Sequence, residues 1–185
     1  MAHQPIWFLN KLPEETCDRA RKEFDLIPTR EAAMGIDGDL VKHSGRDTKV
    51  CFVEQNNWFG ELMAQFASDA NLKCGWNFDI TTHENIQYAT YEPEQHYGWH
   101  IDTFFLTPLE KSLTDRKITV VCLMNDVSEF EEGELQIRME GTEYIVPLEK
   151  GSIVAFPSFL YHQVTPIKSG VRKSSTMWLS GPRFR

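Results

Sequence analysis

The stretch IQYATYEPEQHYGWHID, residues 86–102, decides the fold class because it follows a residue period of two, which is typical of β-strands. In an extended chain successive side chains point to opposite faces, so His100 and Asp102 project together and Trp99 projects to the other side. An imidazole and a carboxylate presented together suit a divalent cation. An H-x-D pair also occurs as ordinary polar residues on a strand, so both interpretations stay open until a third ligand is found.

The same period of two continues from Trp76 towards the end of the chain. Turns such as EEGE, MEGTE and LEKGS separate the short runs that follow it. About eight short strands joined by turns are typical of a sandwich or jelly roll, and not of alternating βαβ units. We expect these strands over about 76–81, 85–92, 97–102, 117–125, 134–139, 143–147, 152–156 and 171–179.

The N-terminal part is predicted to be mainly helical. The sequence LPEE at residues 12–15 is typical of a helix start, with a proline and two acids in the first turn, and predicts a helix over about 13–26. Apolar residues at helical spacing predict a second helix over about 58–70, preceded by a short strand over about 49–53. The fold class is therefore mainly β with flanking helices.

Length and composition are those of an ordinary globular protein, with 185 residues, 41% hydrophobic and 25% charged. We expect one domain over residues 1–185, with helical support over about 1–75 and a jelly-roll core over about 76–182. The opening residues lack the basic region and long apolar run of a secretion signal, and no apolar segment reaches membrane-spanning length. A cytoplasmic protein without a membrane partner is the expectation.

The cysteine spacing indicates the redox state of the thiols, and the net charge limits the classes of binding partner. Four cysteines, at positions 17, 51, 74 and 122, form no C-x-x-C pair and are expected to be free, mostly buried thiols. The formal net charge of −8 disfavours nucleic acid as the main partner. Five basic residues lie near the C-terminus, and we interpret them as a solvated tail: Lys168, Arg172, Lys173, Arg183 and Arg185.

A third ligand for the H-x-D pair is found in FPSFLYHQVTPIKSG, where His162 lies sixty residues beyond Asp102. Two histidines and one carboxylate on one face leave open positions on an octahedral ion, the arrangement of non-haem Fe(II) oxygenases. The remaining histidines are His3, His43, His83 and His96, and they have no comparable partner nearby in sequence. His96 belongs either to the mouth of the site or to a solvent-facing loop.

Arg172 opens the final strand, ten residues after His162. In an alternating strand it shares a face with Ser174, Thr176 and Trp178. An arginine that points into a barrel requires an anionic partner, and a dicarboxylate cofactor would supply one. A surface salt bridge is the alternative interpretation of this arginine.

These segments resemble the 2-oxoglutarate and Fe(II)-dependent dioxygenases, in particular the prolyl 4-hydroxylase-like and PKHD-type hydroxylases. The resemblance is carried by the opening stretch, by VVCLMNDVSEFEEGELQI and by KGSIVAFPSFLYHQVTPIKSGVRKSS, and it covers about residues 76–182. It implies a double-stranded β-helix, which is a cupin-like jelly roll. It also implies that His100, Asp102 and His162 bind Fe(II), that Arg172 grips the distal carboxylate of 2-oxoglutarate, that O2 is consumed, and that ascorbate serves as a reductant.

The resemblance assigns further roles by position. Tyr91 and Thr119 match residues that join the arginine in holding the carboxylate, and Tyr97 and Trp178 match aromatics beside the metal that contact substrate. Core packing is the alternative role for both aromatics. Two departures matter: collagen-type enzymes usually carry lysine where Arg172 stands, and Glu94 replaces a frequent glycine. Substrate identity is therefore not transferred.

The implied reaction is hydroxylation of an unactivated C–H bond of a prolyl or other amino-acid side chain in a protein or peptide, with release of succinate and CO2. One alternative is an oxygenase acting on a small molecule or nucleobase, and another is a non-catalytic jelly roll that senses a metal or ligand. The acidic charge weighs against a nucleobase, and the intact ligand set weighs against a sensor. The glycine-rich segment over about 30–47 is either a mobile substrate lid or a plain surface connection.

Overall fold

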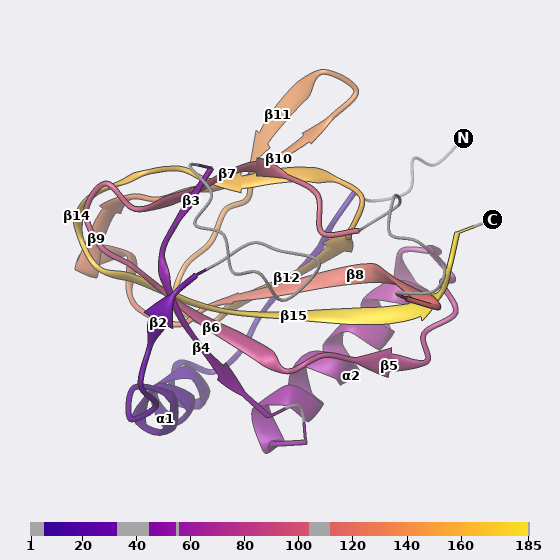
Figure 1. The fold of residues 1–185 in the computed structure, drawn as a ribbon, viewed down its shortest axis with the longest axis horizontal. Helices are drawn as coiled ribbons and strands as arrows, with labels where there is room; N and C mark the ends of the chain where they lie inside the picture. The colour runs from indigo at the N-terminus through magenta and orange to yellow at the C-terminus, as the bar shows by residue number, and fades with distance from the viewer. Residues whose placement is uncertain (1–5, 33–44, 55, 104–111, 185) are drawn as a thin grey trace.

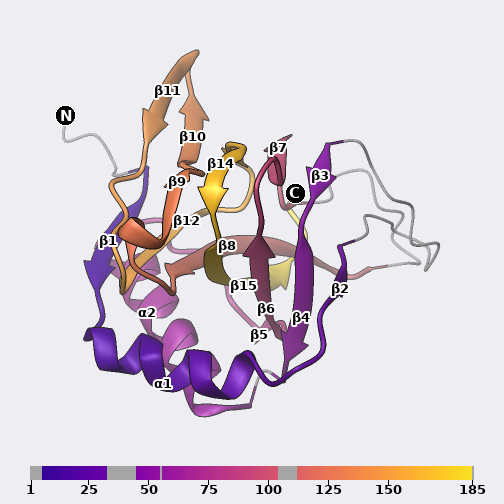
Figure 2. The same cartoon turned by 90° about the vertical axis from the view of Figure 1, so that its left-hand side faces the viewer.

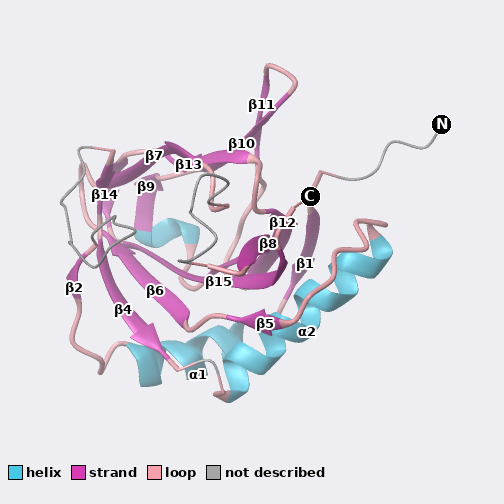
Figure 3. Cartoon of the chain, turned by 45° about the vertical axis from the view of Figure 1, so that its right-hand side comes forward, coloured by secondary structure: helices cyan, strands magenta, loops and turns pink. Residues whose placement is uncertain are grey.

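The computed structural model describes residues 6–32, 45–54, 56–103 and 112–184. Two antiparallel sheets face each other, and the helices cover the outer face of the larger sheet, so the molecule has three layers (Figures 1 and 3). The larger sheet has the order β1 (Phe8–Lys11), β12 (Ser152–Pro157), β8 (Thr114–Leu123), β15 (Arg172–Pro182), β6 (Ile86–Tyr91), β4 (Lys49–Val53) and β2 (Arg30–Glu31), with β5 (Thr82–His83) paired to β15.

The smaller sheet has the order β11 (Thr142–Ile145), β10 (Leu135–Met139), β13 (Tyr161–Val164), β7 (His96–His100) and β3 (Arg46–Asp47). A separate ribbon pairs β9 (Phe130–Glu132) with β14 (Ile167–Gly170), just after the short 3-10 helix η1 (Val127–Glu129). Figure 2 shows the β10–β11 hairpin projecting from the side opposite the helices. This arrangement confirms the predicted double-stranded β-helix with flanking helices.

Both predicted helices are present with small changes at their ends. Helix α1 (Glu14–Phe24) begins after Pro13 and carries acids in its first turn, as the sequence predicted. Helix α2 (Trp58–Lys73) is capped by the side chain of Asn57, which accepts the backbone N–H groups of Phe59 and Gly60. Neither helix in the described part of the chain has the length and apolar character needed to cross a bilayer.

Alternation along the strands builds two hydrophobic cores. On β8, Val120 and Cys122 pack with the helices, and Val121 packs between the two sheets. The helix-side core includes Phe24 of α1 and Met63 of α2, both buried. All four cysteines are free and buried, which confirms the prediction from their spacing. The inner core between the sheets surrounds the site described below.

One predicted strand is absent from the structure, and several observed strands were not predicted. No strand forms over 76–81, because the side chain of Asn71 binds both the N–H and the carbonyl of Phe78 and removes them from ladder pairing. The predictions also missed β1, β5, β9, β13 and β14, whose partners lie far away in sequence and leave no local signal. Of the predicted loop over about 30–47, the ends form β2 and β3, and residues 33–44, on which the lid prediction rests, lie outside the described residues.

Two glycines with positive φ offer a matched stability test. Gly170 (φ 77°) lies against the backbone of Glu129, so a Cβ atom there would overlap the carbonyl oxygen, whereas Gly141 (φ 79°) has open space around it. Gly141→Ala should cost about 1–2 kcal/mol for the left-handed conformation alone. Gly170→Ala should cost about 3 kcal/mol or more, because the β9–β14 ribbon must shift. Urea unfolding of both variants measures the difference, and equal losses would contradict the predicted clash.

Candidate active site

The structure brings His100, Asp102 and His162 together between the sheets. His100 ends β7 and is the cross-strand partner of His162 on β13. The potential donor atoms of the three side chains lie within 4.8 Å of one another. The Nε2 atom of His162 is 3.3 Å from Oδ2 of Asp102, and Nε2 of His100 is 3.6 Å from Oδ1. The three predicted ligands therefore form a compact cluster.

Asp102 is not on the strand that the period-two pattern predicted through residue 102. Strand β7 ends at His100, and the N–H of Asp102 donates to the carbonyl of Ser158 at 2.9 Å. Ser158 follows β12, so the position of Asp102 depends on the opposite sheet as well as on its own strand. The two side chains of the H-x-D pair thus converge because the chain leaves β7 after His100 and bends at Asp102, and not through simple alternation.

Both imidazoles are oriented by backbone carbonyls. Nδ1 of His100 lies 2.8 Å from the carbonyl oxygen of Gly98, and Nδ1 of His162 lies 2.9 Å from that of Leu160. A carbonyl can only accept, so Nδ1 carries a proton in both rings, and Nε2, the ring nitrogen nearest Asp102, is the atom that would bind a metal. This orientation is the one that metal-binding histidines take, and the donor set fits a divalent cation such as Fe(II).

The electrostatics of the cluster also suit a cation. Asp102 and His162 are buried, with 4% and 5% of their surfaces exposed. Burial would raise the pKa of Asp102, but the attraction of His162 and their hydrogen bond lower it. Burial and the charge of His162 lower the pKa of His100 to about 3, whereas Asp102 raises the pKa of His162 despite its burial. The site therefore keeps a buried carboxylate ionised beside a neutral imidazole.

Thr119 occupies a different place from the one that the resemblance assigned. Its hydroxyl donates to Oδ2 of Asp102 at 2.7 Å and lies 3.0 Å from the hydroxyl of Ser158. In the register of β8 and β15 its neighbour is Trp178, while Ser174, two residues after Arg172, lies opposite Leu123. Thr119 thus lies at the cluster of potential metal ligands and away from Arg172. Its hydrogen bond to Asp102 orients the carboxylate.

The Thr119 hydroxyl is expected to tune metal affinity. Thr119→Val keeps the shape but removes the donor, so Asp102 loses a buried partner and Fe(II) affinity should fall about tenfold to a hundredfold. Thr119→Ser retains the hydroxyl and is expected to bind as the wild type does. Anaerobic Fe(II) titration of both variants measures this effect, and equal affinities for Val and Ser would contradict the assigned contact.

Arg172 is almost completely buried, with 1% of its surface exposed. Its Nη1 donates to the hydroxyl of Ser174 at 3.0 Å, and among the described residues its Nη2 has no hydrogen-bond partner. Burial lowers the pKa of the guanidinium. The Tyr91 ring, its cross-strand neighbour, lies 5.6 Å from the guanidinium carbon. Its burial shows that the surface salt-bridge interpretation is wrong, and a buried cation with an unused donor among the described residues is suited to an anionic ligand.

The basic residues near the C-terminus do not form one solvated tail. Besides the burial of Arg172, Lys168 pairs with Glu131, Lys173 pairs with Asp25 and Arg183 pairs with Asp115. Arg185 lies outside the described residues, as do His3 and His43. The positive charges of Lys168, Lys173 and Arg183 are therefore paired with three separate acidic residues.

The three ligands line a narrow metal-side cavity of about 30 Å³ together with Tyr91, Tyr97 and Trp178. The predicted face of the last strand is confirmed here, because Ser174 and Thr176 line the same cavity. Tyr97 stacks on His100 with ring centroids 3.5 Å apart. Trp178 is covered by the guanidinium of Arg116 at 3.8 Å, so its ring serves packing as well as the cavity wall. His96 lies outside this cavity and its Nδ1 is 3.2 Å from the carbonyl oxygen of Glu94.

Sequence reasoning missed two arginines beside these aromatics. Arg46 on β3 lies over the Tyr97 ring at 4.4 Å, and Arg116 on β8 lies over Trp178. Arg46 reaches the site because β3 pairs with β7, a contact between segments about fifty residues apart. Arg116 could have been recognised as a site residue because it precedes the apolar run of its strand. The local sequence around Arg46 offers no comparable signal.

The fold and site define a double-stranded β-helix protein in which two histidines and one carboxylate converge, as non-haem Fe(II) sites require, near a buried arginine. A family model described as the 2OG-Fe(II) oxygenase superfamily matches residues 86–180, which is more than half of the chain. The chain belongs to this family.

Individual relatives support the same assignment. The chain is 31% identical over 93 residues to a PKHD-type hydroxylase of Psychrobacter sp. (strain PRwf-1), covering 50% of this chain and 36% of that protein. It is 34% identical over 90 residues to a PKHD-type hydroxylase of Shewanella baltica (strain OS155), covering 48% and 39%. The matched region thus spans less than half of the length of these curated relatives.

Solved structures share the fold over most of the chain. A Pseudomonas putida prolyl-4-hydroxylase has a TM-score of 0.70 at 18% identity, covering 97% of this chain and 94% of that one. A Trichoplax adhaerens prolyl hydroxylase, solved with a peptide of the hypoxia inducible factor oxygen degradation domain, has a TM-score of 0.67 at 16% identity, covering 94% and 83%. These similarities establish the double-stranded β-helix.

Proposed function

We propose that this chain is an Fe(II)- and 2-oxoglutarate-dependent dioxygenase that hydroxylates an unactivated C–H bond, releasing succinate and CO2. One observation carries the proposal: a convergent His, Asp, His cluster lies between the sheets with a buried arginine whose Nη2 has no partner in the described part of the chain. The cluster fits Fe(II) and the arginine fits a carboxylate, and 2-oxoglutarate is a ligand that would satisfy both.

Each side chain has a separate task in this proposal. His100, Asp102 and His162 hold the metal through Nε2, a carboxylate oxygen and Nε2, with both rings oriented by backbone carbonyls. Arg172, supported by Ser174, binds the distal carboxylate of 2-oxoglutarate, and Tyr91 packs beside it. With iron and 2-oxoglutarate bound, the site supplies oxidative decarboxylation coupled to insertion of one oxygen atom of O2 into the substrate. Ascorbate is proposed as the external reductant.

The substrate side is assigned to the aromatic wall of the metal-side cavity. Tyr97 is proposed to contact substrate, because it stacks on a metal ligand and lines the cavity. Burial raises the pKa of its phenol to about 12, so the group stays protonated and offers a hydrogen-bond donor. Trp178 is proposed to close the other side of this wall.

We propose a prolyl or other amino-acid side chain in a protein or peptide as the substrate. Support comes from the structural neighbours whose descriptions name prolyl hydroxylases, one of them bound to a peptide. The aromatic lining of the metal-side cavity is compatible with an apolar ring or aliphatic side chain.

Succinate formation tests the reaction class. Protein supplied with Fe(II), 2-oxoglutarate, O2 and ascorbate should release succinate, and peptides from a host lysate should gain the mass of one oxygen atom. The Asp102→Ala variant should do neither, because an incomplete ligand set holds the metal weakly. Tight metal and 2-oxoglutarate binding without any succinate, with or without lysate, would favour a sensor over an enzyme.

A further inference from the structure

Regular pairing between β8 and β15 ends beside Arg172. The register of the two strands runs as far as Leu123, which lies opposite Ser174. The N–H of Met124 still donates to the carbonyl of Lys173 at 2.9 Å, after which the chain forms the short helix η1. The backbone groups of β15 that flank Arg172 on this edge therefore require a partner other than a strand.

The side chain of Asn125 supplies that partner. Its Nδ2 donates to the carbonyl of Val171 at 2.8 Å, and its Oδ1 accepts the N–H of Lys173 at 2.7 Å. Since a backbone carbonyl accepts and a backbone N–H donates, these two partners fix the orientation of the amide. Asn125 is 1% exposed, so both bonds lie in the interior, where an unpaired group is costly. The side-chain amide thus replaces one peptide group of the sheet.

These two hydrogen bonds hold the residues on either side of Arg172. On its other edge, Arg172 pairs with Tyr91 of β6. The backbone over residues 171–173 is consequently fixed from both sides, by a strand on one side and by the Asn125 side chain on the other.

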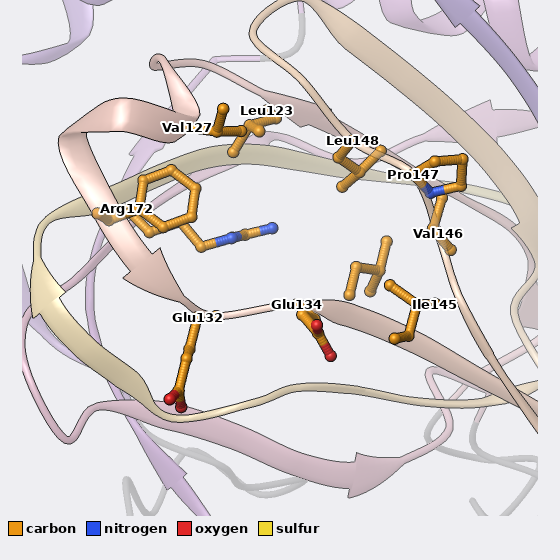
Figure 4. Close-up of a pocket in the computed structure, with 12 residues that line it drawn as sticks. Leu123, Val127, Glu132, Glu134, Ile145, Val146, Pro147, Leu148 and Arg172 are labelled. Carbon is orange, nitrogen blue, oxygen red and sulfur yellow. The ribbon is translucent and has the colours of Figure 1, made fainter.

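The place of the guanidinium depends on this short piece of backbone. The side chain of Arg172 extends into a cavity of about 320 Å³ that is lined mainly by apolar residues (Figure 4). Its Nη1 donates to Ser174, which belongs to the same strand. A displacement of β15 at Arg172 would therefore move the guanidinium and its supporting hydroxyl together, and Ser174 could not correct it.

We propose that Asn125 is a positioning residue for the binding of 2-oxoglutarate and that it acts through the backbone of Arg172. This inference rests on the proposed function, in which Arg172 binds the distal carboxylate of that co-substrate. Asn125 lines neither the metal-side cavity nor the cavity of Arg172, so its effect has to pass through the arginine. A paired contact to a carboxylate tolerates displacements of only about 0.5 Å, so loss of the amide should weaken co-substrate binding and leave the metal ligands in place.

Asn71 of α2 provides a matched control, because its side chain makes the same pair of hydrogen bonds elsewhere. Its Nδ2 donates to the carbonyl of Phe78 and its Oδ1 accepts the N–H of Phe78, both at 2.9 Å. Asn71 is 8% exposed and lines neither cavity. Asn125→Ala and Asn71→Ala each remove two backbone partners from the interior, so both should lower the free energy of unfolding by similar amounts.

Affinity for 2-oxoglutarate separates the two variants. With Fe(II) present and O2 excluded, Asn125→Ala should raise the Kd of 2-oxoglutarate about tenfold or more, whereas Asn71→Ala should keep the wild-type value. The Kd of Fe(II) should be unchanged in both. Asn125→Gln carries the amide on a side chain one methylene longer, which displaces residues 171–173, so it should also raise the Kd of 2-oxoglutarate and serves if the Ala variant does not fold.

Two further measurements test the route through Arg172. Backbone amide exchange of Lys173 in the ligand-free protein should become about tenfold faster or more in Asn125→Ala and stay unchanged in Asn71→Ala. In an Arg172→Gln background, Asn125→Ala should change the Kd of 2-oxoglutarate by less than about threefold, because the two residues act as one unit.

Equal Kd values for 2-oxoglutarate in the wild type and the Asn125 variants would overturn the inference, and so would equal losses of affinity in the Asn125 and Asn71 variants. An undiminished effect of Asn125→Ala in the Arg172→Gln background would overturn the action through Arg172. Failure of the wild type to bind 2-oxoglutarate would instead overturn the proposed function, and the exchange of Lys173 would still decide whether Asn125 holds this backbone.

Discussion

Arg172→Gln is expected to weaken 2-oxoglutarate binding by about 2–4 kcal/mol, roughly thirtyfold to a thousandfold in affinity. The reason is geometric, because a guanidinium offers a carboxylate paired N–H donors that glutamine cannot reproduce. The side chain of Arg172 hydrogen-bonds to Ser174 and is not part of the cluster of His100, Asp102 and His162. Fe(II) affinity should therefore remain nearly normal. Titration with 2-oxoglutarate in the presence of Fe(II) and the absence of O2 measures both values.

Stability and a matched control separate a ligand role for Arg172 from a structural one. Because the wild-type guanidinium is buried and lacks an ionic partner in the described residues, its replacement should leave the free energy of unfolding of the ligand-free protein unchanged or higher. Lys168→Gln changes a surface cation paired with Glu131 and should bind 2-oxoglutarate normally. Normal binding by Arg172→Gln, with a loss in Lys168→Gln, would show that the anchor is misassigned.

Asp102→Ala is expected to lose Fe(II) binding and turnover while the protein remains folded. Asp102 is the anionic member of the cluster, and its removal leaves two imidazoles that hold a divalent cation weakly. The loss should exceed the roughly tenfold to hundredfold effect expected for its hydrogen-bond partner Thr119. Anaerobic Fe(II) titration and succinate formation measure the two consequences.

The fold should survive this substitution because no buried charge is stranded. Burial lowers the pKa of His162 and is its largest single influence, so without the raising effect of Asp102 the neutral ring is favoured, although the hydrogen bond to the Leu160 carbonyl still raises the pKa. Asp69→Ala, on the exposed face of α2, is the matched control and should bind Fe(II) normally. Wild-type metal affinity in Asp102→Ala would remove this residue from the ligand set.

Local periodicity was enough to predict the β class, both helices and the face shared by Arg172, Ser174 and Thr176. The physical reason is that side-chain direction repeats every two residues in a strand and about every 3.6 residues in a helix. A one-residue error in register would move all the side chains of one face to the opposite face. Within one strand, alternation therefore determines which side chains share a face. The H-x-D pair and the distal histidine were recognisable because metal chemistry restricts the residue types.

Long-range contacts decided what periodicity could not. Asp102 lies beyond the end of its strand and is positioned by Ser158, and Thr119 contacts Asp102 across 17 residues of sequence. Arg46 reaches Tyr97 only because β3 pairs with β7. Each of these contacts joins segments that are distant in sequence, so no local periodicity predicts it.

The residue types needed for a metal and for a carboxylate were thus readable from the sequence alone, because chemistry limits which side chains can serve. Burial is a property of the packed sheets, so only the tertiary structure decided that Arg172 is enclosed, with one donor unpaired within residues 6–32, 45–54, 56–103 and 112–184. The same holds for the cavity of about 320 Å³ that Arg172 lines, whose wall combines residues from β8, η1, β10 and the segment after β11. Its shape depends on how these elements pack against one another, which no single stretch of sequence encodes.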